Sequence, residues 1–220
     1  MTQRTDEPDP AREDANALSR RRFLKGAGEV AAGGVIASGL IGATARTAAG
    51  SASAAEVETL AGEVDIELTI NGAKQTLKVE PRTTLLSALR NHCSPTLTGT
   101  KLVCDRGNCG ACTVIVDGSP RYACLQLAVD LRGKEIRTIE GLATGDELTP
   151  LQDEFCKQDA LMCGFCTPGF LMSITAALEK KPNCSLEEVK QSCAGNVCRC
   201  GTYPHIFTAA LAAGKRMGGR

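Results

Sequence analysis

The chain has 220 residues, a formal net charge of zero, no tryptophan and an aromatic content of only 3%. This charge balance gives no reason to expect a nucleic acid or an anionic membrane as partner. The core must be built from Ala, Val, Ile and Leu, because aromatic side chains are scarce. Twelve cysteines are many for a chain of this length. They indicate disulfides or a metal site, and their spacing must decide between the two.

Residues 1–55 have the composition of an export signal rather than of a folded domain. Residues 1–17 are polar and charged, which predicts disorder. A basic segment follows at 19–25 (Ser-Arg-Arg-Arg-Phe-Leu-Lys), then an uncharged Gly/Ala-rich stretch at 30–44 and a small-residue cleavage site at 52–54. The paired arginines before Phe-Leu-Lys resemble a twin-arginine signal, whose route carries proteins that are already folded. The sequence therefore predicts a periplasmic or otherwise exported protein.

The alternative for this segment is a permanent membrane anchor. Its uncharged stretch of about 15 residues is shorter than the roughly 20 needed to span a bilayer, and Glu29 and Arg46 bound it. We therefore expect no stable membrane span. A folded-protein route would also suit a chain that needs its metal before export.

Residues 62–140 have the pattern of a mostly β domain. Apolar and polar residues alternate over 64–70, as in a half-buried strand. The Asn-Gly pair at 71–72 predicts a hairpin turn, and the return strand runs through 77–79.

Three further elements are predicted in this domain. A short helix over 85–89 can be capped by Thr83 or Thr84. The β-branched run at 113–116 ends in an Asp-Gly turn, which indicates another hairpin. The isoleucines at 136 and 139 predict a last short strand.

Residues 146–218 have the pattern of four short helices. Helix-start signals stand at 149–152, which has proline at the first helical position, and at 185–188. Further helices are predicted over 170–178 and 205–214. Such a set suggests a small bundle, and a metal centre commonly stabilises domains below 100 residues, as both halves are.

The first cysteine group has the spacing C-x4-C-x2-C-x11-C. Its members are Cys104, Cys109, Cys112 and Cys124. This spacing is typical of the plant-type ferredoxin loop that binds a [2Fe–2S] cluster. Small residues between the cysteines let backbone N–H groups approach the sulfurs. Structural zinc is the alternative, but it favours paired C-x2-C knuckles, and only one such spacing is present. Disulfides between residues three apart are possible but strained.

The second cysteine group has the pattern C-x2-C…C-x-C. Its members are Cys163, Cys166, Cys198 and Cys200. The 31 residues between the two pairs suffice for two helices that run out and back, so both pairs are expected at one end of the bundle. A helix begins just after Cys166, and its N-terminal N–H groups would favour anionic thiolates. The pattern predicts a second iron–sulfur cluster.

Three stretches, at 99–113, 163–169 and 195–203, resemble the iron–sulfur subunit of the molybdenum hydroxylases. This family includes xanthine dehydrogenase, carbon monoxide dehydrogenase and the aldehyde oxidoreductases. The resemblance covers about residues 66–212, and the export signal is similar to the arrangement in periplasmic aldehyde oxidoreductase.

The resemblance implies an α+β fold, with an N-terminal β-grasp plant-type ferredoxin domain at 62–140 and a C-terminal four-helix bundle domain at 146–218. Each domain would hold one [2Fe–2S] cluster. The molybdopterin cofactor and the substrate would lie on a large partner subunit. Electrons would pass through the bundle cluster and then the ferredoxin cluster to an FAD subunit, a cytochrome or another acceptor. No residue of this chain would be catalytic.

One residue departs from the family pattern. The family usually has Gln immediately before the first bundle cysteine, in contact with the pterin, whereas this chain has Met162. A thioether accepts hydrogen bonds only weakly and donates none, so the pterin contact is replaced or the partner geometry differs. Cys200, which lies near the pterin in the family, is present.

Four cysteines belong to neither group: Cys93, Cys156, Cys184 and Cys193. They are expected to pack as small apolar side chains, Cys156 included. A disulfide between Cys184 and Cys193 is the alternative, because the predicted destination is oxidising. Arg106 and Arg199 lie inside the two ligand loops. They are expected to raise the cluster potential, to guide a partner or simply to be solvated, and pairing with a neighbouring carboxylate or with the pterin phosphate of the partner is a further alternative for Arg199.

Two other function classes stay open at this stage. One is a free-standing exported two-cluster carrier without an enzyme partner, and the other is a zinc-stapled interaction module. The helical second half favours the subunit, because a soluble ferredoxin needs only the first domain.

Overall fold

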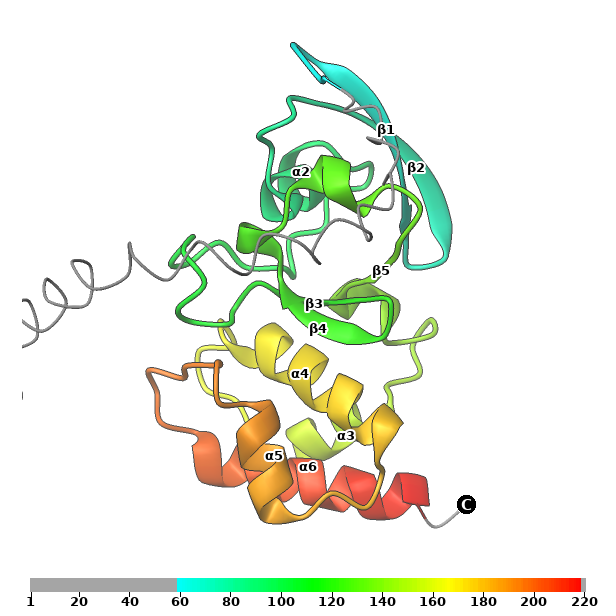
Figure 1. Cartoon of the computed structure of the whole chain (residues 1–220). Coiled ribbons are helices and arrows are strands. Elements are labelled where there is room, and N and C mark those ends of the chain that lie inside the picture. Colours follow the sequence, from blue (N-terminus) through cyan, green and yellow to red (C-terminus); the bar gives the residue numbers. More distant parts are fainter. Residues whose placement is uncertain (1–58, 219–220) are drawn as a thin grey trace, which may run out of the picture. The chain divides into compact units, whose positions relative to one another are not determined.

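The computed structural model describes residues 59–218, so the expected disordered N-terminus and twin-arginine signal at 1–55 lie outside the described residues. Within the described part, a mixed sheet is followed in the chain by a group of helices (Figure 1). This is the predicted α+β fold, with the β-rich segment first and the helical segment second.

The sheet has five strands. They are β1 (Val64–Ile70), β2 (Ala73–Val79), β3 (Thr113–Val116), β4 (Ser119–Tyr122) and β5 (Glu135–Arg137). Their order in the sheet is β2-β1-β5-β3-β4. The two hairpins β1–β2 and β3–β4 are antiparallel, whereas β5 joins them by pairing parallel to β1 and antiparallel to β3. This topology is the predicted β-grasp arrangement.

The first hairpin follows from its sequence pattern. In β1 the alternate residues Ile66, Leu68 and Ile70 are buried. The turn at 71–72 has positive φ at both residues, 52° and 78°, which Asn and Gly adopt at low cost. Helix α2 (Leu85–Asn91) covers this part of the sheet and is capped by Thr84, whose hydroxyl accepts the N–H of Ser87 at 3.2 Å.

The last strand is shorter than predicted. Strand β5 ends at Arg137, and Ile139 begins a one-turn 3-10 helix, η3 (Ile139–Gly141), instead of continuing the strand. The reason is that the N–H of Thr138 donates to the side-chain oxygen of Asn71 at 2.8 Å and leaves the ladder. Two other 3-10 turns, η1 (Ala123–Leu125) and η2 (Ala128–Leu131), connect β4 to β5.

The second half contains four helices, as predicted. They are α3 (Pro150–Lys157), α4 (Thr167–Lys180), α5 (Leu186–Ser192) and α6 (Tyr203–Gly218). Both expected capping boxes form, with Thr149 and Gln152 before α3 and with Ser185 and Glu188 before α5. Helices α4 and α6 are longer than predicted at both ends. Tyr203 and Met217, near the two ends of α6, pack partly against the apolar cluster of the helices.

Helix α4 joins the two halves. It packs along β3, as Figure 1 shows. Ile115 of β3 is 3% exposed and belongs to the apolar cluster of the helices rather than to that of the sheet. Arg137 and Glu179 form an ion pair across the same contact. Each half therefore has its own apolar cluster, and the two halves pack against each other through β3 and α4.

Candidate metal centres

The first thiol group lies where the long loop after α2 enters β3. Cys104, Cys109 and Cys112 belong to this loop, and Cys124 lies in η1 directly after β4. The thiols are grouped in pairs, because the pKa of Cys104 responds to Cys109 and the pKa of Cys112 responds to Cys124. Cys112 also interacts electrostatically with Cys109. The structure thus brings together all four cysteines that the spacing grouped.

Backbone N–H groups surround the exposed end of this thiol group. The N–H of Arg106 lowers the pKa of Cys104 to about 6, with further hydrogen bonds from Cys109 and Asn108. The Asn108 nitrogen is 3.4 Å from the Cys104 sulfur. The loop turns its N–H groups inward through a positive φ of 76° at Gly107. Such a loop stabilises a thiolate, which is the form that binds metal.

The other end of the group is buried. Burial raises the pKa of the Cys112 thiol to about 12. A thiol in this setting loses its proton only when a cation replaces it, so metal binding here releases protons.

The second thiol group lies at the starts of α4 and α6. Cys163 and Cys166 precede α4, and Cys198 and Cys200 precede α6. The thiols again meet in pairs, Cys166 with Cys198 and Cys163 with Cys200. The two helices bring both pairs to one end of the bundle, as predicted.

As in the first group, one thiol of the second group has a raised pKa and another has a lowered pKa. Burial raises the pKa of Cys166 to about 12. Burial acts to raise the pKa of Cys198, but the hydroxyl and backbone N–H of Thr202, the Cys166 thiol and the Cys200 backbone together outweigh it and lower this pKa to about 7. The Thr202 oxygen is 3.1 Å from the Cys198 sulfur. Cys166 is the N-cap of α4 without a side-chain capping bond, so the first N–H groups of that helix open toward the thiols.

The donor set fits a binuclear cluster. Within residues 59–218, no three His, Cys, Asp or Glu side chains converge on a single metal-ion position. A [2Fe–2S] cluster has two irons, each held by two protein ligands, and two pairs of thiols match that requirement. The hydroxyl of Thr167, next to Cys166, is buried without a hydrogen-bond partner in this structure. A cluster sulfur beside it would satisfy this donor.

The two thiol groups are joined through the backbone. The N–H of Val197, the residue before Cys198, donates to the carbonyl of Cys109 at 3.0 Å. One residue of the first group is therefore hydrogen-bonded to the immediate neighbour of a residue of the second. The sequence pattern did not predict this contact, because the two residues are far apart in the chain.

Exposed apolar side chains stand beside the ligand cysteines in the loops of both groups, and we call them the apolar rim. They are Leu102, Val103, Leu161, Met162, Phe165 and Val197. Met162 is the most exposed, at 69%. A shallow pocket of about 120 Å³ opens in the rim between Cys109 and Cys163. An exposed apolar patch of this kind marks an interaction surface.

The remaining cysteines have different environments. Cys93 and Cys193 are buried and Cys184 is partly buried, as expected, but the prediction that Cys156 packs is wrong because it is exposed on α3. Helix α5 lies between Cys184 and Cys193. At 1.5 Å per residue it separates them by about 13 Å, and a disulfide needs Cα atoms closer than about 7 Å. All four are free thiols.

The two arginines of the ligand loops, Arg106 and Arg199, are both exposed. Sequence reasoning missed a different residue, Asn196, which is 5% exposed and lies between the two thiol groups. The only signal in the sequence was that a polar residue, Asn196, stands two positions before the predicted ligand Cys198. The sequence did not show that its amide is buried.

No helix within residues 59–218 is both long enough and apolar enough to cross a membrane.

Comparison with known proteins agrees with this geometry. Residues 68–142 match the family described as "2Fe-2S iron-sulfur cluster binding domain", and residues 138–211 match the family described as "[2Fe-2S] binding domain". The two matches divide the chain as the structure does, into the β-grasp part and the helical part.

Individual relatives extend the comparison to nearly the whole described chain. The nicotine 6-hydroxylase small subunit of Paenarthrobacter nicotinovorans is 46% identical over 157 residues, which cover 71% of this chain and 93% of that protein. The aldehyde oxidoreductase iron–sulfur-binding subunit of Escherichia coli O157:H7 is 43% identical over 159 residues, 66% of this chain and 69% of that protein. A chain in the crystal structure of quinoline 2-oxidoreductase from Pseudomonas putida 86 superposes with a TM-score of 0.67 at 43% identity, over 72% of this chain and 99% of that chain.

A ferredoxin-type domain followed by a helical cluster-binding domain defines an iron–sulfur electron-transfer protein. The chain belongs to the family of small iron–sulfur subunits of the molybdenum hydroxylases.

Proposed function

We propose that this chain relays electrons from a molybdopterin site on a large partner subunit to an acceptor, through two [2Fe–2S] clusters. The observation that carries the proposal is the presence of two groups of four thiols, each arranged as two pairs and joined by the hydrogen bond between Val197 and Cys109. The related subunits of nicotine 6-hydroxylase and aldehyde oxidoreductase support the same role.

The ligand assignment is part of the proposal. Cys104, Cys109, Cys112 and Cys124 would hold one cluster, and Cys163, Cys166, Cys198 and Cys200 would hold the other. When bound, each cluster accepts and returns one electron. The chain's own residues keep the clusters in place, donate N–H groups to the sulfurs and limit access of water. None of them takes part in bond making or breaking on the substrate.

The apolar rim is the surface proposed to bind the large subunit. Its pocket is lined by cysteines of both thiol groups, and Cys163 and Cys200 of the second group are exposed. An apolar rim around exposed ligands excludes water once a partner covers it, and electrons can then cross a short distance. Met162 and Cys200 lie on this face and would approach the pterin. The acceptor on the other side would be an FAD subunit or a cytochrome.

Export by the twin-arginine route is proposed on the sequence at 19–25. Replacing Arg20 and Arg21 together by Lys should retain the iron-loaded protein in the cytoplasm, as measured by cell fractionation and immunoblotting. The matched control is Arg22→Lys, which changes the third arginine and leaves the pair intact. Export of the double variant at the normal level would contradict the proposal.

The cluster assignment is tested by iron analysis and EPR. The unmodified chain should contain about four irons and four acid-labile sulfides, and the reduced protein should show two distinct EPR signals. Cys109→Ser should remove one signal, lower the iron content to about two and leave the other signal unchanged.

The control for this experiment is Cys156→Ser, which changes an exposed thiol outside both groups. It should leave both EPR signals and the iron content unchanged. Two intact signals in the Cys109→Ser variant would show that the ligand assignment is wrong. Co-purification with a molybdenum-containing chain distinguishes the subunit from a free-standing carrier.

A further inference from the structure

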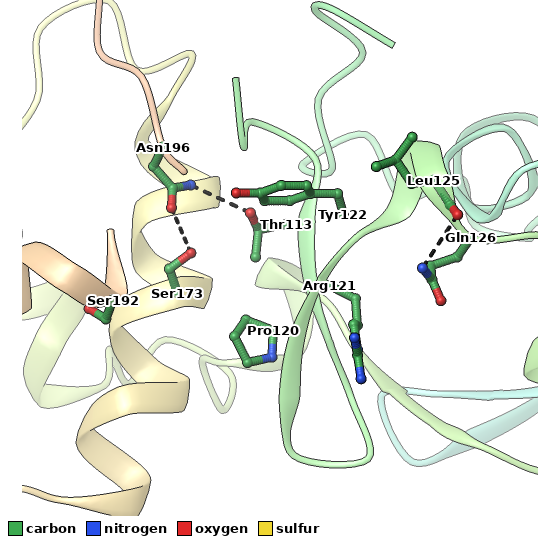
Figure 2. A pocket seen from close by; sticks show the side chains of 9 residues that line it. All are labelled: Thr113, Pro120, Arg121, Tyr122, Leu125, Gln126, Ser173, Ser192 and Asn196. Carbon is green, nitrogen blue, oxygen red and sulfur yellow. Dashed lines mark hydrogen bonds between the residues drawn. The ribbon is translucent and has the colours of Figure 1, made fainter. Parts of the chain in front are cut away.

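Asn196 connects the two thiol loops through its side chain. Its amide nitrogen donates to the carbonyl of Gly110 at 3.0 Å and lies 3.4 Å from the hydroxyl of Thr113. Its amide oxygen accepts the hydroxyl of Ser173 at 2.8 Å. Figure 2 shows the amide between these two hydroxyls, one on β3 and the other on α4. One side chain therefore contacts the first thiol loop, the strand that follows it and the helix of the second group.

These bonds continue the backbone contact between the loops. Val197, which follows Asn196, donates its N–H to Cys109, and Cys109 precedes Gly110. Two adjacent residues of one loop thus hold two adjacent residues of the other. If the Asn196 amide is removed, its bond to Gly110 is lost, and of these two hydrogen bonds only the one from Val197 to Cys109 remains.

Three glycines make this close approach possible. A Cβ atom on Gly110 would lie 2.5 Å from the carbonyl oxygen of Gly195, and one on Gly169 would lie 2.3 Å from the carbonyl oxygen of Gly110. A Cβ on Gly195 would overlap the hydroxyl of Tyr122. The backbones are in contact, so a small shift of either loop changes the distance between the two thiol groups.

Open space lies on one side of this contact. A cavity of about 300 Å³ opens there, lined by Asn196 itself, by Tyr122 and Ser192, and by the exposed Arg121 (Figure 2). Beside this open space, the hydrogen bonds of Asn196 restrain the loop together with Tyr122, whose hydroxyl packs against Gly195.

We propose that Asn196 is a positioning residue that fixes the separation of the two cluster-binding loops and thereby sets the rate of electron exchange between them. This inference rests on the proposed electron-transfer function. In each exchange one cluster loses one electron and is oxidised, while the other gains it and is reduced. No bond forms or breaks and no proton is transferred, so distance and the intervening contacts determine the rate.

The experiment compares the full-length, iron-loaded protein with its Asn196→Ala variant by two measurements. The first is hydrogen exchange of the Val197 amide, followed by mass spectrometry, which should become about tenfold faster because a neighbouring buried hydrogen bond is lost. The second is the spin–spin interaction between the two clusters in the EPR spectrum of the fully reduced protein. It should weaken, because it decreases steeply with distance.

The control is Val189→Ala on α5, a fully buried apolar residue outside this network. It should destabilise the bundle and leave both the Val197 exchange and the spin–spin interaction unchanged. Should Asn196→Ala fail to accumulate, Ser173→Ala replaces it, since that change removes the bond that orients the amide and keeps the donor to Gly110.

The outcomes are distinct. Unchanged Val197 exchange and unchanged spin–spin interaction in the variant that folds would overturn the role of Asn196. Equal changes in Val189→Ala would also overturn it, because the effect would then follow stability alone. A wild-type protein without iron and sulfide would instead contradict the proposed function. The exchange of the Val197 amide would still test whether Asn196 holds the two loops together.

Discussion

Single residues determine how close the two domains can approach. Gly169 lies in the first turn of α4, directly against the carbonyl of Gly110. This contact is between a helix and a backbone atom, and a backbone atom cannot rotate away as a side chain can. A glycine is therefore required there for a packing reason, although glycine is a poor helix former.

Replacing this residue, Gly169→Ala, should destabilise the protein by about 1–3 kcal/mol, because the added methyl group meets a fixed backbone oxygen. The gain in helix propensity, about 1 kcal/mol, is smaller than the steric cost. Chemical denaturation followed by circular dichroism measures the change. Gly218→Ala on α6 is the control, since its Cβ would meet only the end of the Asn183 side chain. Equal effects of the two substitutions would show that the contact with Gly110 is unimportant.

At the scale of elements, the short helices depend on their ends more than on their length. Helix α5 has only seven residues and one fully buried apolar side chain, Val189. Its capping box satisfies N–H groups at the start, since Ser185 accepts from Glu188 and Glu188 accepts from Ser185 at 2.8 Å. Isolated helices of this length are unstable in water, so the cap and the burial of Val189 hold this element.

The pH dependence of α5 follows from Glu188. The Lys181 ammonium, together with the hydrogen bonds from Ser185, lowers the pKa of Glu188 to about 2 from its ordinary value of 4.5. The folded-state pKa is below the unfolded one, so the carboxylate stabilises the fold above pH 4.5, and this contribution is lost as the pH falls toward 2. An NMR titration of the Glu188 side chain should show a midpoint near 2, and Lys181→Met should raise it. A midpoint at the ordinary value would contradict this arrangement.

The cap itself is tested by Ser185→Ala. Loss of the hydroxyl acceptor should cost about 1 kcal/mol of folding stability, measured by denaturation at neutral pH. The control is Ser94→Ala, because the Ser94 side chain contributes to no helix cap. If both variants were equally stable, the capping box would contribute nothing.

At the scale of the described molecule, the β-rich part and the helical part belong to one compact unit. The sheet residue Ile115 packs in the apolar cluster of the helices, and α4 lies against β3. The two parts therefore cannot separate without exposing Ile115 and the face of α4 that covers β3. This rigidity suits electron transfer, because a fixed distance between the thiol groups needs a fixed contact between the domains.

Cooperativity provides the test at this scale. Ile115→Ala should lower the stability by about 2–5 kcal/mol, and the sheet and the helices should still lose hydrogen-exchange protection together. Hydrogen exchange measured by mass spectrometry reports the two parts separately. Protection that persists in the sheet after the helices have lost theirs would contradict the coupling of the two parts through Ile115 and α4.

Much of this fold was predictable because its signals are local. The alternation at 64–70, the Asn-Gly turn after it and the two capping boxes each use neighbouring residues, and all are confirmed. Strand β5 was predicted too long, because the hydrogen bond that ends it comes from Asn71, which is 67 residues away from Thr138. The exposure of Cys156 was likewise decided by which face of α3 meets the bundle.

The sequence by itself determined which cysteines form each group, because ligand spacing along a loop is a local property that chemistry constrains tightly. Only the tertiary structure decided how the thiols pair, and how Asn196 brings the loops together across 86 residues of chain. The physical reason is that contacts between backbones depend on packing of whole elements, and residue spacing does not encode them.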